Sequence, residues 1–215
     1  MLDLTWMVMV AYLIGSISGS LVLGRLRGID IRLMGSGNAG GTNAFRSVGW
    51  LFALLVVMID VGKGVVAAGL VPRLPMLFSA EAAFSGPALA GACGLAAVIG
   101  HVWPVFFGFR GGKGAGTAVG VVAVVAPWCI APLVLVWVIT VLGTGYVGLA
   151  TVLAGFSLVP AMWLLAPQTP VPPSLGALAV ALAGLLLFTH RGNLARLRVG
   201  TENRFDKIRV FKRKP

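Results

Sequence analysis

The chain has 215 residues, of which 58% are hydrophobic and only 11% are charged, and its formal net charge at pH 7 is +11. A water-soluble globule of this size cannot bury that much apolar surface, so the composition excludes a soluble protein and predicts an integral membrane protein. The positive charge is unevenly distributed along the chain, and this makes the membrane topology predictable.

Seven apolar segments are predicted to cross the membrane, so we expect an all-α integral membrane protein with a single polytopic domain over residues 1–215. Segment 4–24 is long enough to span and lacks both a basic leader and a convincing cleavage site, so we interpret it as a retained helix and not as a signal peptide. The predicted helices cover residues 4–24, 48–71, 86–103, 116–126, 132–143, 147–166 and 175–190.

The fourth and fifth helices come from one apolar run, 116–142. This run is longer than the roughly 20 residues that one span needs, and it contains Pro127 and Pro132, which interrupt helices. Dividing the run into two short helices gives an odd number of crossings. The amino terminus is then external, while segment 143–151 and the basic tail 191–215 are cytoplasmic.

The distribution of cations supports this topology. Cations are concentrated in segments 25–47 and 104–115 and after His190, whereas segments 72–85 and 166–174 have one cation between them. By the positive-inside rule, the first three regions are cytoplasmic and the last two are external. Some of these cations serve only to anchor the topology.

The first cytoplasmic region contains the glycine-rich stretch GSGNAGGTNAFRSVG, residues 35–49. Glycine lets the backbone turn and approach a ligand closely, and the hydroxyl, amide and guanidinium groups between these glycines are not needed for helix packing. The stretch also precedes an expected helix start, so it suits an anion. The candidate binding residues here are Ser36, Gly37, Asn38, Gly40, Thr42, Asn43 and Arg46.

Two features within the predicted spans are interpreted as structural. Asp60 and Lys63 are three residues apart in the second span, and we expect them to pair with each other or with a neighbour, although charges inside a membrane are also functional candidates. The glycines of segment 86–100 are expected to allow close helix packing.

The second cytoplasmic region, within GHVWPVFFGFRGGKGAGTAVG (residues 100–120), again combines glycines with cations. It is not a nucleotide-binding P-loop, because Phe107 stands where that motif needs glycine and Gly114 where it needs a hydroxyl. We expect an anion site close to the start of the next helix. The candidate residues are Arg110, Gly111, Gly112, Lys113, Gly114 and Thr117.

The third region, HRGNLARLRVGTENRF at residues 190–205, follows the last span. The chain has only six acidic residues, and no two of them form a plausible magnesium or two-metal cluster near the glycine-rich segments, so a metal-dependent phosphotransferase is not expected. We expect no metal and no cofactor. The lipid bilayer is the expected environment, and neither nucleic acid nor an obligate protein partner is inferred.

These three regions together resemble the signature motifs of one family, in the same order and at the same spacing. The family is that of the acyl-phosphate-dependent glycerol-3-phosphate acyltransferases, the PlsY family of bacterial inner membranes. Three positions depart from the usual pattern: Gly41 replaces an alanine, and Arg110 and Arg204 replace lysines. None of these departures removes a cation or a polar partner.

The resemblance implies that an acyl group passes from acyl phosphate to the 1-hydroxyl of glycerol 3-phosphate, giving lysophosphatidic acid and phosphate. It implies that the first motif holds a phosphate or the reacting carbonyl, that Gly111, Gly112 and Lys113 cradle glycerol 3-phosphate, and that Glu202 is structural. Thr151 matches a position where relatives commonly have serine. The residues expected to take part in catalysis are Ser36, Arg46, Lys113, His190 and Asn193.

Two questions remain open at this level. The proton of the attacking hydroxyl can go either to His190 or to a substrate phosphate, and we favour the phosphate. A transporter of phosphate or of a phosphorylated lipid precursor would also use cations beside glycine-rich breaks, and a regulatory membrane subunit is a further alternative.

Overall fold

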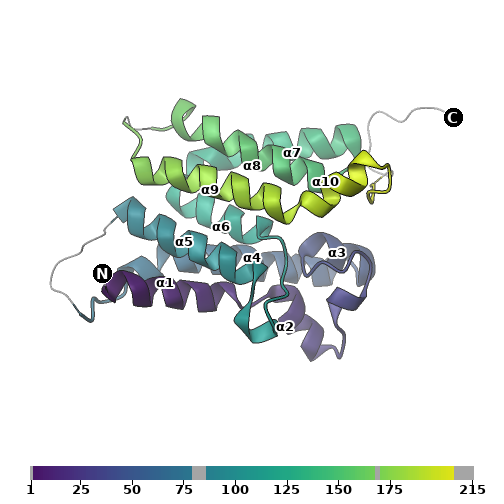
Figure 1. Ribbon diagram of the computed structural model, residues 1–215, viewed down its shortest axis with the longest axis horizontal. Helices are drawn as coiled ribbons and strands as arrows, with labels where there is room; N and C mark the ends of the chain where they lie inside the picture. The colour runs from purple at the N-terminus through teal and green to yellow at the C-terminus, as the bar shows by residue number, and fades with distance from the viewer. Residues whose placement is uncertain (1, 79–85, 168–169, 206–215) are drawn as a thin grey trace. The chain divides into compact units, whose positions relative to one another are not determined.

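The computed structural model describes residues 2–78, 86–167 and 170–205, and within these ranges the chain forms helices and loops but no strand (Figure 1). The chain divides into two compact units, Met1–Pro127 and Trp128–Pro215, which are described in turn. The expected single domain over 1–215 stays a prediction. Residues 206–215 of the predicted basic tail lie outside the described residues.

In the first unit, α4 is the central helix. It packs against α2, α3, α5 and α6, and α1 packs along α5 (Figure 1). The helices of this unit are α1 (Leu2–Gly15), α2 (Gly19–Leu26), α3 (Gly41–Ser47), α4 (Trp50–Gly69), α5 (Gly86–Val102) and α6 (Ala115–Val125), with the 3₁₀ turns η1 (Ile31–Leu33), η2 (Val71–Arg73) and η3 (Val105–Phe107).

Glycines bring α1 and α5 into backbone contact. A β-carbon at Gly15 would collide with the backbone of Ala97, and one at Gly100 would collide with the carbonyl oxygen of Tyr12. Such close approach is the usual role of small residues between membrane helices. The packing interpretation of segment 86–100 is therefore confirmed at Gly100, and likewise at Gly94, where a β-carbon would collide with Val121.

The segment 4–24, predicted to be one retained span, is not one continuous helix, although its two parts together are long and apolar enough to make a broken span. The chain leaves helical geometry between α1 and α2, and the two helices are bent by 48° relative to each other. A break inside a membrane exposes backbone groups that lipid cannot satisfy. Here the polar side chains of Asp60 and Lys63 from α4 bind the open backbone groups, and these partners lie too far along the chain to be read from the local sequence.

The prediction of two short helices in the fourth and fifth positions is half right. Helix α6 has 11 residues, but the next apolar helical segment, η4 (Pro127–Cys129) with α7 (Ile130–Thr144), has 18. Pro132 lies in the first turn of α7, where the backbone N–H groups have no partner within the helix, so it does not interrupt the helix.

The number of crossings stays a prediction. Among the described residues, four helices are long and apolar enough to cross alone, and the count rises to six if each of two bent pairs makes one span. Helix α6 is the further, shorter apolar helix that a seventh crossing requires.

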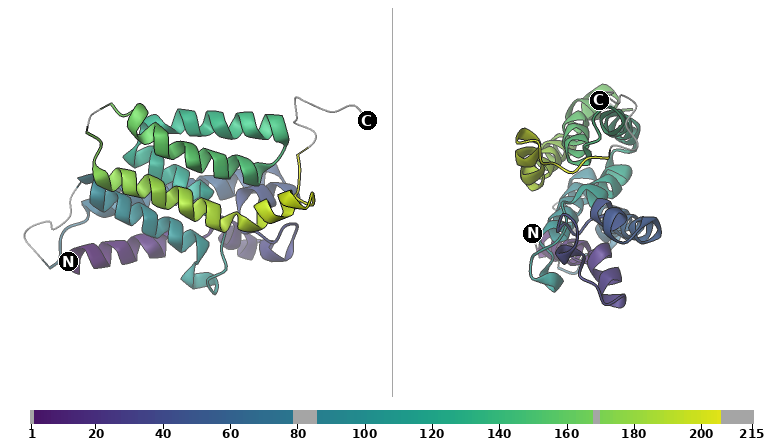
Figure 2. Two further views of the ribbon diagram at one scale, coloured as in Figure 1. Left: turned by 45° about the horizontal axis from the view of Figure 1, so that its top comes forward. Right: turned by 90° about the vertical axis from the view of Figure 1, so that its right-hand side faces the viewer.

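In the second unit, α7, α8 (Val147–Leu164) and α9 (Pro173–Thr189) lie side by side, with α7 against α8 and α8 against α9 (Figure 2). The short helix α10 (Arg191–Arg198) contacts α8 and α9 and is bent by 52° relative to α9. Apolar side chains on α7, such as Leu135 and Ile139, are exposed, as expected for a surface that faces lipid.

Candidate active site

Asn43 organises the first glycine-rich segment from within. Its side-chain amide is buried and donates to the carbonyl oxygens of Ile31 (3.1 Å) and Met34 (2.9 Å). Its carbonyl oxygen accepts from the backbone N–H of Ser36 at 2.9 Å and, more weakly, from the Ser47 hydroxyl at 3.5 Å. The side chain of Asn43 therefore shapes the loop, with its donors and acceptor used by the loop itself.

The other predicted residues of this segment differ in their helical position and in their exposure. The short helix α3 begins at Gly41, so Thr42 and Asn43 lie in its first turn as expected, but Arg46 lies in its last turn and not at its start. The exposed members are Ser36, Gly37 and Arg46, and the half-buried ones are Asn38, Gly40 and Thr42.

Arg32 ties the first and second glycine-rich segments together. Its guanidinium binds the carboxylate of Asp30 (2.8–3.2 Å) and donates to the carbonyl oxygens of Phe107 (3.0 Å) and Arg110 (3.3 Å). The hydrogen bonds from Arg32 lower the pKa of the Asp30 carboxyl, so the pair is ionised at neutral pH. Sequence reasoning treated Arg32 only as a topological cation, although the adjacent Asp30 was a usable signal.

The second glycine-rich segment folds back onto the end of α5. The backbone N–H of Gly111 donates to the carbonyl oxygen of Val102, and that of Gly112 donates to the carbonyl oxygen of His101, both at 3.1 Å. A β-carbon at Gly112 would collide with Nε2 of His101 and lie 2.6 Å from the carbonyl oxygen of Ala39. Glycine is therefore required at 112, and the first segment passes directly beside it.

Helix α6 begins immediately after this turn. Its N-cap is Gly114, which has a left-handed conformation (φ +87°) and no side chain with which to cap the helix. Lys113 is half-buried just before the cap, while Arg110 is exposed. The hydroxyl of Thr117 is fully buried and has no hydrogen-bond partner in the part of the chain that the structure describes.

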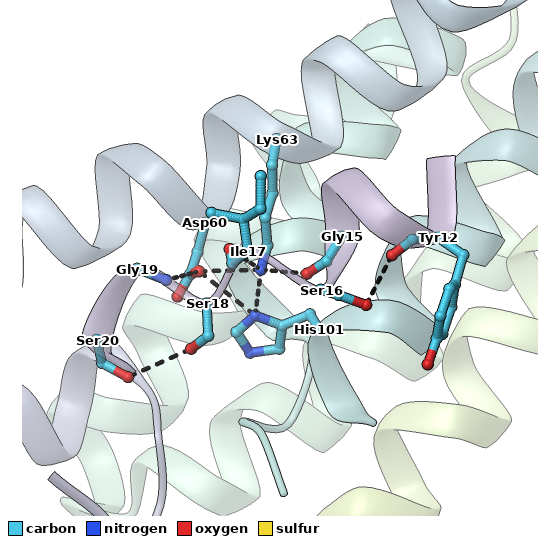
Figure 3. Close-up of polar contacts among 10 residues, drawn as sticks. All are labelled: Tyr12, Gly15, Ser16, Ile17, Ser18, Gly19, Ser20, Asp60, Lys63 and His101. Carbon is cyan, nitrogen blue, oxygen red and sulfur yellow. Dashed lines mark hydrogen bonds and ion pairs between the residues drawn. The ribbon is translucent and has the colours of Figure 1, made fainter. Parts of the chain in front are cut away.

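The break between α1 and α2 is filled by the side chain of Lys63 (Figure 3). The Nζ atom of Lys63 lies 2.7 Å from the carbonyl oxygen of Gly15, 2.9 Å from that of Ile17 and 2.8 Å from Nδ1 of His101. These three acceptors match the three hydrogens of an ammonium group. We therefore assign His101 as neutral, with Nδ1 accepting from Lys63 and the ring proton on Nε2.

Asp60 completes this buried cluster (Figure 3). Its Oδ1 atom accepts from the backbone N–H of Gly19 at 3.1 Å, lies 3.2 Å from Nζ of Lys63 and lies 3.4 Å from Nδ1 of His101. The cation thus binds the carbonyl group of Gly15, the last residue of α1, and that of Ile17 in the break, while the carboxylate binds the first turn of α2, which is the arrangement that helix dipoles favour. The sequence indicated Asp60 and Lys63, but gave no sign that His101 joins them.

In the second unit, Glu202 gathers the third motif. Its carboxylate, whose side chain is 5% exposed, accepts from Nδ2 of Asn193 at 2.6 Å and from Nε of Arg196 at 2.8 Å. A β-carbon at Gly148 would lie 2.8 Å from the side chain of Asn193, so the start of α8 packs closely against α10. Glu202 therefore fixes both Asn193 and the segment that follows α10.

The segment 143–151 lies beside the third motif in this unit. Nε of Arg204 donates to the carbonyl oxygen of Thr144, and the backbone N–H of Phe205 donates to that of Gly145, both at 2.9 Å. Thr151 is buried. Its hydroxyl donates to the carbonyl oxygen of Val147 at 2.9 Å and accepts from the Trp137 indole at 3.3 Å.

His190 lies at the bend between α9 and α10. Its ring is buried, and Nδ1 lies 2.8 Å from the carbonyl oxygen of Leu186. Because a carbonyl oxygen only accepts, Nδ1 carries a proton, and Nε2 is an acceptor in the neutral ring. This is the reverse of the assignment for His101.

The structure thus brings the predicted residues together in two groups. The first unit joins the segments that carry Ser36, Arg46 and Lys113, and the second joins the segments that carry Asn193 and Thr151. Convergence of all these residues on one ligand stays a prediction. In the described ranges, no three His, Cys, Asp or Glu side chains are grouped as metal ligands would be.

A family model described as glycerol-3-phosphate acyltransferase matches residues 5–200. The chain belongs to this family. A glycerol-3-phosphate acyltransferase of Chlorobaculum parvum is 40% identical over 230 residues, covering 95% of this chain and 97% of the relative. A relative with the same description from Aquifex aeolicus is 38% identical over 200 residues, covering 93% and 98%.

Two crystal structures have the same fold as this member of the glycerol-3-phosphate acyltransferase family. Both are of PlsY (YgiH), described as an integral membrane glycerol 3-phosphate acyltransferase. The glycerol 3-phosphate form is 34% identical, with a TM-score of 0.80 and coverage of 95% of this chain and 96% of that one. The lysophosphatidic acid form is 35% identical, with a TM-score of 0.81 and coverage of 96% and 97%. The resemblance drawn from the three motifs and the expected all-α integral membrane fold are confirmed.

Proposed function

We propose that this protein transfers a fatty acyl group from acyl phosphate to the 1-hydroxyl of glycerol 3-phosphate, releasing lysophosphatidic acid and inorganic phosphate in the first step of phospholipid synthesis. The observation that carries the proposal is the full-length match to an acyltransferase crystallised in glycerol 3-phosphate and lysophosphatidic acid forms. The choice of acyl phosphate as donor rests on the three sequence motifs.

The reaction needs no covalent enzyme intermediate. The hydroxyl oxygen of glycerol 3-phosphate attacks the acyl carbonyl carbon, the bond from that carbon to the donor's phosphate oxygen breaks, and phosphate leaves with the electron pair. Two anionic substrates repel each other, so the protein must supply positive charge and fixed N–H donors where charge collects. No metal or cofactor is proposed.

The second glycine-rich segment is suited to hold the phosphate of glycerol 3-phosphate. Lys113 immediately precedes Gly114, the glycine N-cap of α6, so a cation and helix N–H groups are adjacent. Gly111, Gly112 and Gly114 keep this backbone bare, and Arg110 adds a second cation. We assign Lys113 the principal role.

The first motif and the third motif are assigned to the donor and the reacting carbonyl. In the first unit, Ser36 and Arg46 are exposed, so that the Arg46 guanidinium can neutralise the donor phosphate and the Ser36 hydroxyl can donate a hydrogen bond to it. In the second unit, Asn193 and Thr151 are likewise assigned to binding the acyl phosphate donor and its reacting carbonyl.

The proton of the attacking hydroxyl is assigned to a substrate phosphate, with His190 as a binding residue. The Nδ1–H to Leu186 contact makes Nε2 the acceptor of a neutral ring, so His190 is the rival base. Replacing His190 with Gln separates the two assignments. Retention of a tenth or more of wild-type turnover supports the phosphate, whereas a loss beyond a thousandfold supports His190, since general base catalysis contributes roughly 10² to 10⁴-fold.

The proposed location is the inner membrane of a bacterium, with the amino terminus external and the carboxyl terminus cytoplasmic. The cation-rich segments 25–47 and 104–115 are joined through Arg32, and 143–151 is joined to the third motif through Arg204. Each of these two pairs agrees with the proposal that both of its segments lie on the cytoplasmic face of the membrane, which the positive-inside rule assigns to cation-rich loops.

The deciding experiment uses the purified protein in lipid nanodiscs with labelled glycerol 3-phosphate, an acyl phosphate or an acyl-CoA as donor, and a chelator throughout. Lysophosphatidic acid from acyl phosphate alone supports the proposal, and product from acyl-CoA alone refutes the donor assignment. Lys113→Met is expected to lower kcat/KM at least 100-fold, the scale of losing one electrostatic stabiliser. The matched control Arg73→Met removes an exposed cation from η2 and should change it less than twofold.

The transporter alternative gains no support from the broken first span. In transporters such breaks bind ions or substrates, but here the side chain of Lys63 occupies the open carbonyl groups. Uptake of labelled phosphate into sealed proteoliposomes, without acyl transfer, would favour the transporter.

A further inference from the structure

The buried cluster of Asp60, Lys63 and His101 has no role in the proposed chemistry, yet one of its members, His101, directly contacts the second glycine-rich segment. All three side chains are at most 6% exposed. Capping the break between α1 and α2 accounts for Asp60 and Lys63, because both bind backbone groups there. It does not account for His101, which binds no backbone group of the break.

His101 contacts the glycine-rich segment in two ways. Its backbone carbonyl oxygen accepts from the N–H of Gly112 at 3.1 Å, and its Nε2 atom occupies the space where a β-carbon of Gly112 would lie. The carbonyl oxygen of Ala39 borders the same space. The imidazole, which extends from α5, therefore packs against the backbone where both glycine-rich segments meet.

Lys63 fixes the orientation of that imidazole. In this assignment the ring cannot turn about its χ2 axis without losing the 2.8 Å hydrogen bond between Nδ1 and the buried Lys63 ammonium. Nε2 and its proton consequently face Gly112. Nε2 forms no hydrogen bond with any of the described residues, so its contact with the loop is one of shape.

We propose that His101 is a positioning residue, held by Lys63, which in turn pairs with Asp60, and that it fixes the position of the Gly111–Gly112 backbone and so the location of Lys113. The inference rests on the proposed function only in assigning the phosphate of glycerol 3-phosphate to Lys113. A displacement of about 1 Å at a substrate-binding group can cost about 100-fold in rate, so the support beneath this loop matters for catalysis.

Replacing His101 with Asn or with Gln tests separately the two contacts that the imidazole makes, one with Lys63 and one with Gly112. His101→Asn places an oxygen near the Nδ1 position, where it can accept from Lys63, but leaves the space beneath Gly112 empty. His101→Gln reaches the Nε2 position and fills that space, while Lys63 keeps Gly15 and Ile17 as acceptors. A purely stabilising role would not predict that Gln is better than Asn.

Two measurements test the proposal. The first is hydrogen exchange of the peptide covering residues 104–117, in which the amides of Gly111 and Gly112 are hydrogen-bonded to α5. The second is steady-state kinetics with glycerol 3-phosphate as the varied substrate. The matched control is Asp3→Ala, because Asp3 is buried in the same unit but binds the N–H groups of Leu77 and Phe78, at the other end of α1.

We expect His101→Asn to exchange at least tenfold faster at Gly111 and Gly112 and to raise KM for glycerol 3-phosphate at least tenfold, with a smaller change in kcat. His101→Gln and Asp3→Ala should remain within threefold of wild type in both measurements. Equal losses in the Asn and Gln variants, or no loss in either, would overturn the proposal. If the wild-type protein does not acylate glycerol 3-phosphate, the proposed function fails, and the exchange data still decide the role of His101.

Discussion

Removing both charges of the buried pair should cost less than the sum of the costs of removing each one alone. Lys63→Met leaves the Asp60 carboxylate with a single backbone donor, Gly19, and leaves the carbonyl groups of Gly15 and Ile17 without one. Breaking a buried pair from one side costs about 3–5 kcal/mol of the free energy of unfolding. Asp60→Asn should cost less than Lys63→Met, because the ammonium keeps three acceptors.

The double variant Asp60→Asn/Lys63→Met leaves no charge in the hydrocarbon region. Its main cost is the two orphaned carbonyl groups, each worth about 1–3 kcal/mol. Additive single costs would total about 6–10 kcal/mol, so we expect the double variant to be about 2–3 kcal/mol more stable than the sum, the upper range for residues in contact. Additivity within about 0.5 kcal/mol would refute the reasoning, as would a Lys63→Met variant as stable as wild type.

The cysteines of the chain provide an assay for this free energy. Cys93 in the first unit and Cys129 in the second are free and fully buried, and they are the only two in the sequence. In a Cys129→Ala background, the rate at which a thiol reagent labels Cys93 reports opening of the first unit, when opening is a rapid pre-equilibrium. A Cys93→Ala background reports the second unit and serves as the control.

Three shorter predictions follow. Arg32→Gln should lower the stability of the first unit by about 1–3 kcal/mol, through two lost bonds to backbone carbonyl groups such as that of Phe107, with Cys protection as the measurement. Gly112→Ala should lower kcat/KM more than 100-fold, because the added methyl collides with the imidazole beneath it; near-normal kinetics would contradict the packing described. Glu202→Gln should release Arg196 and speed hydrogen exchange in α10 at least tenfold, while leaving the first unit unchanged.

The sequence predicted the helices and the glycine-rich segments well because both are local signals. The apolar lengths set α4, α5, α8 and α9 to within a few residues of the expected bounds. Similarly, glycines mixed with hydroxyl and amide groups marked segment 35–49 without any knowledge of its partners. The comparisons then confirmed the family that these motifs resemble.

The sequence could not reveal features that depend on distant partners. Nothing in the stretch around Ile17 distinguishes a broken helix from a continuous one, since the group that stabilises the break, Lys63, lies 46 residues further along. His101 likewise looked like the end of an apolar span. Pro132 was misread for a different reason, because its effect depends on whether it lies in the first turn of a helix or in its interior.

The motif residues divide into two classes that the sequence alone does not separate. Asn43, Arg32 and Glu202 direct their polar atoms at backbone groups or at one another within the motifs, which fixes the loops. Ser36 is exposed on the first of these loops, and Arg46 is exposed in the last turn of α3. An anion site needs both classes, because a bare glycine backbone is too flexible to hold N–H groups and cations in place, and the internal hydrogen bonds supply the rigidity that the glycines remove.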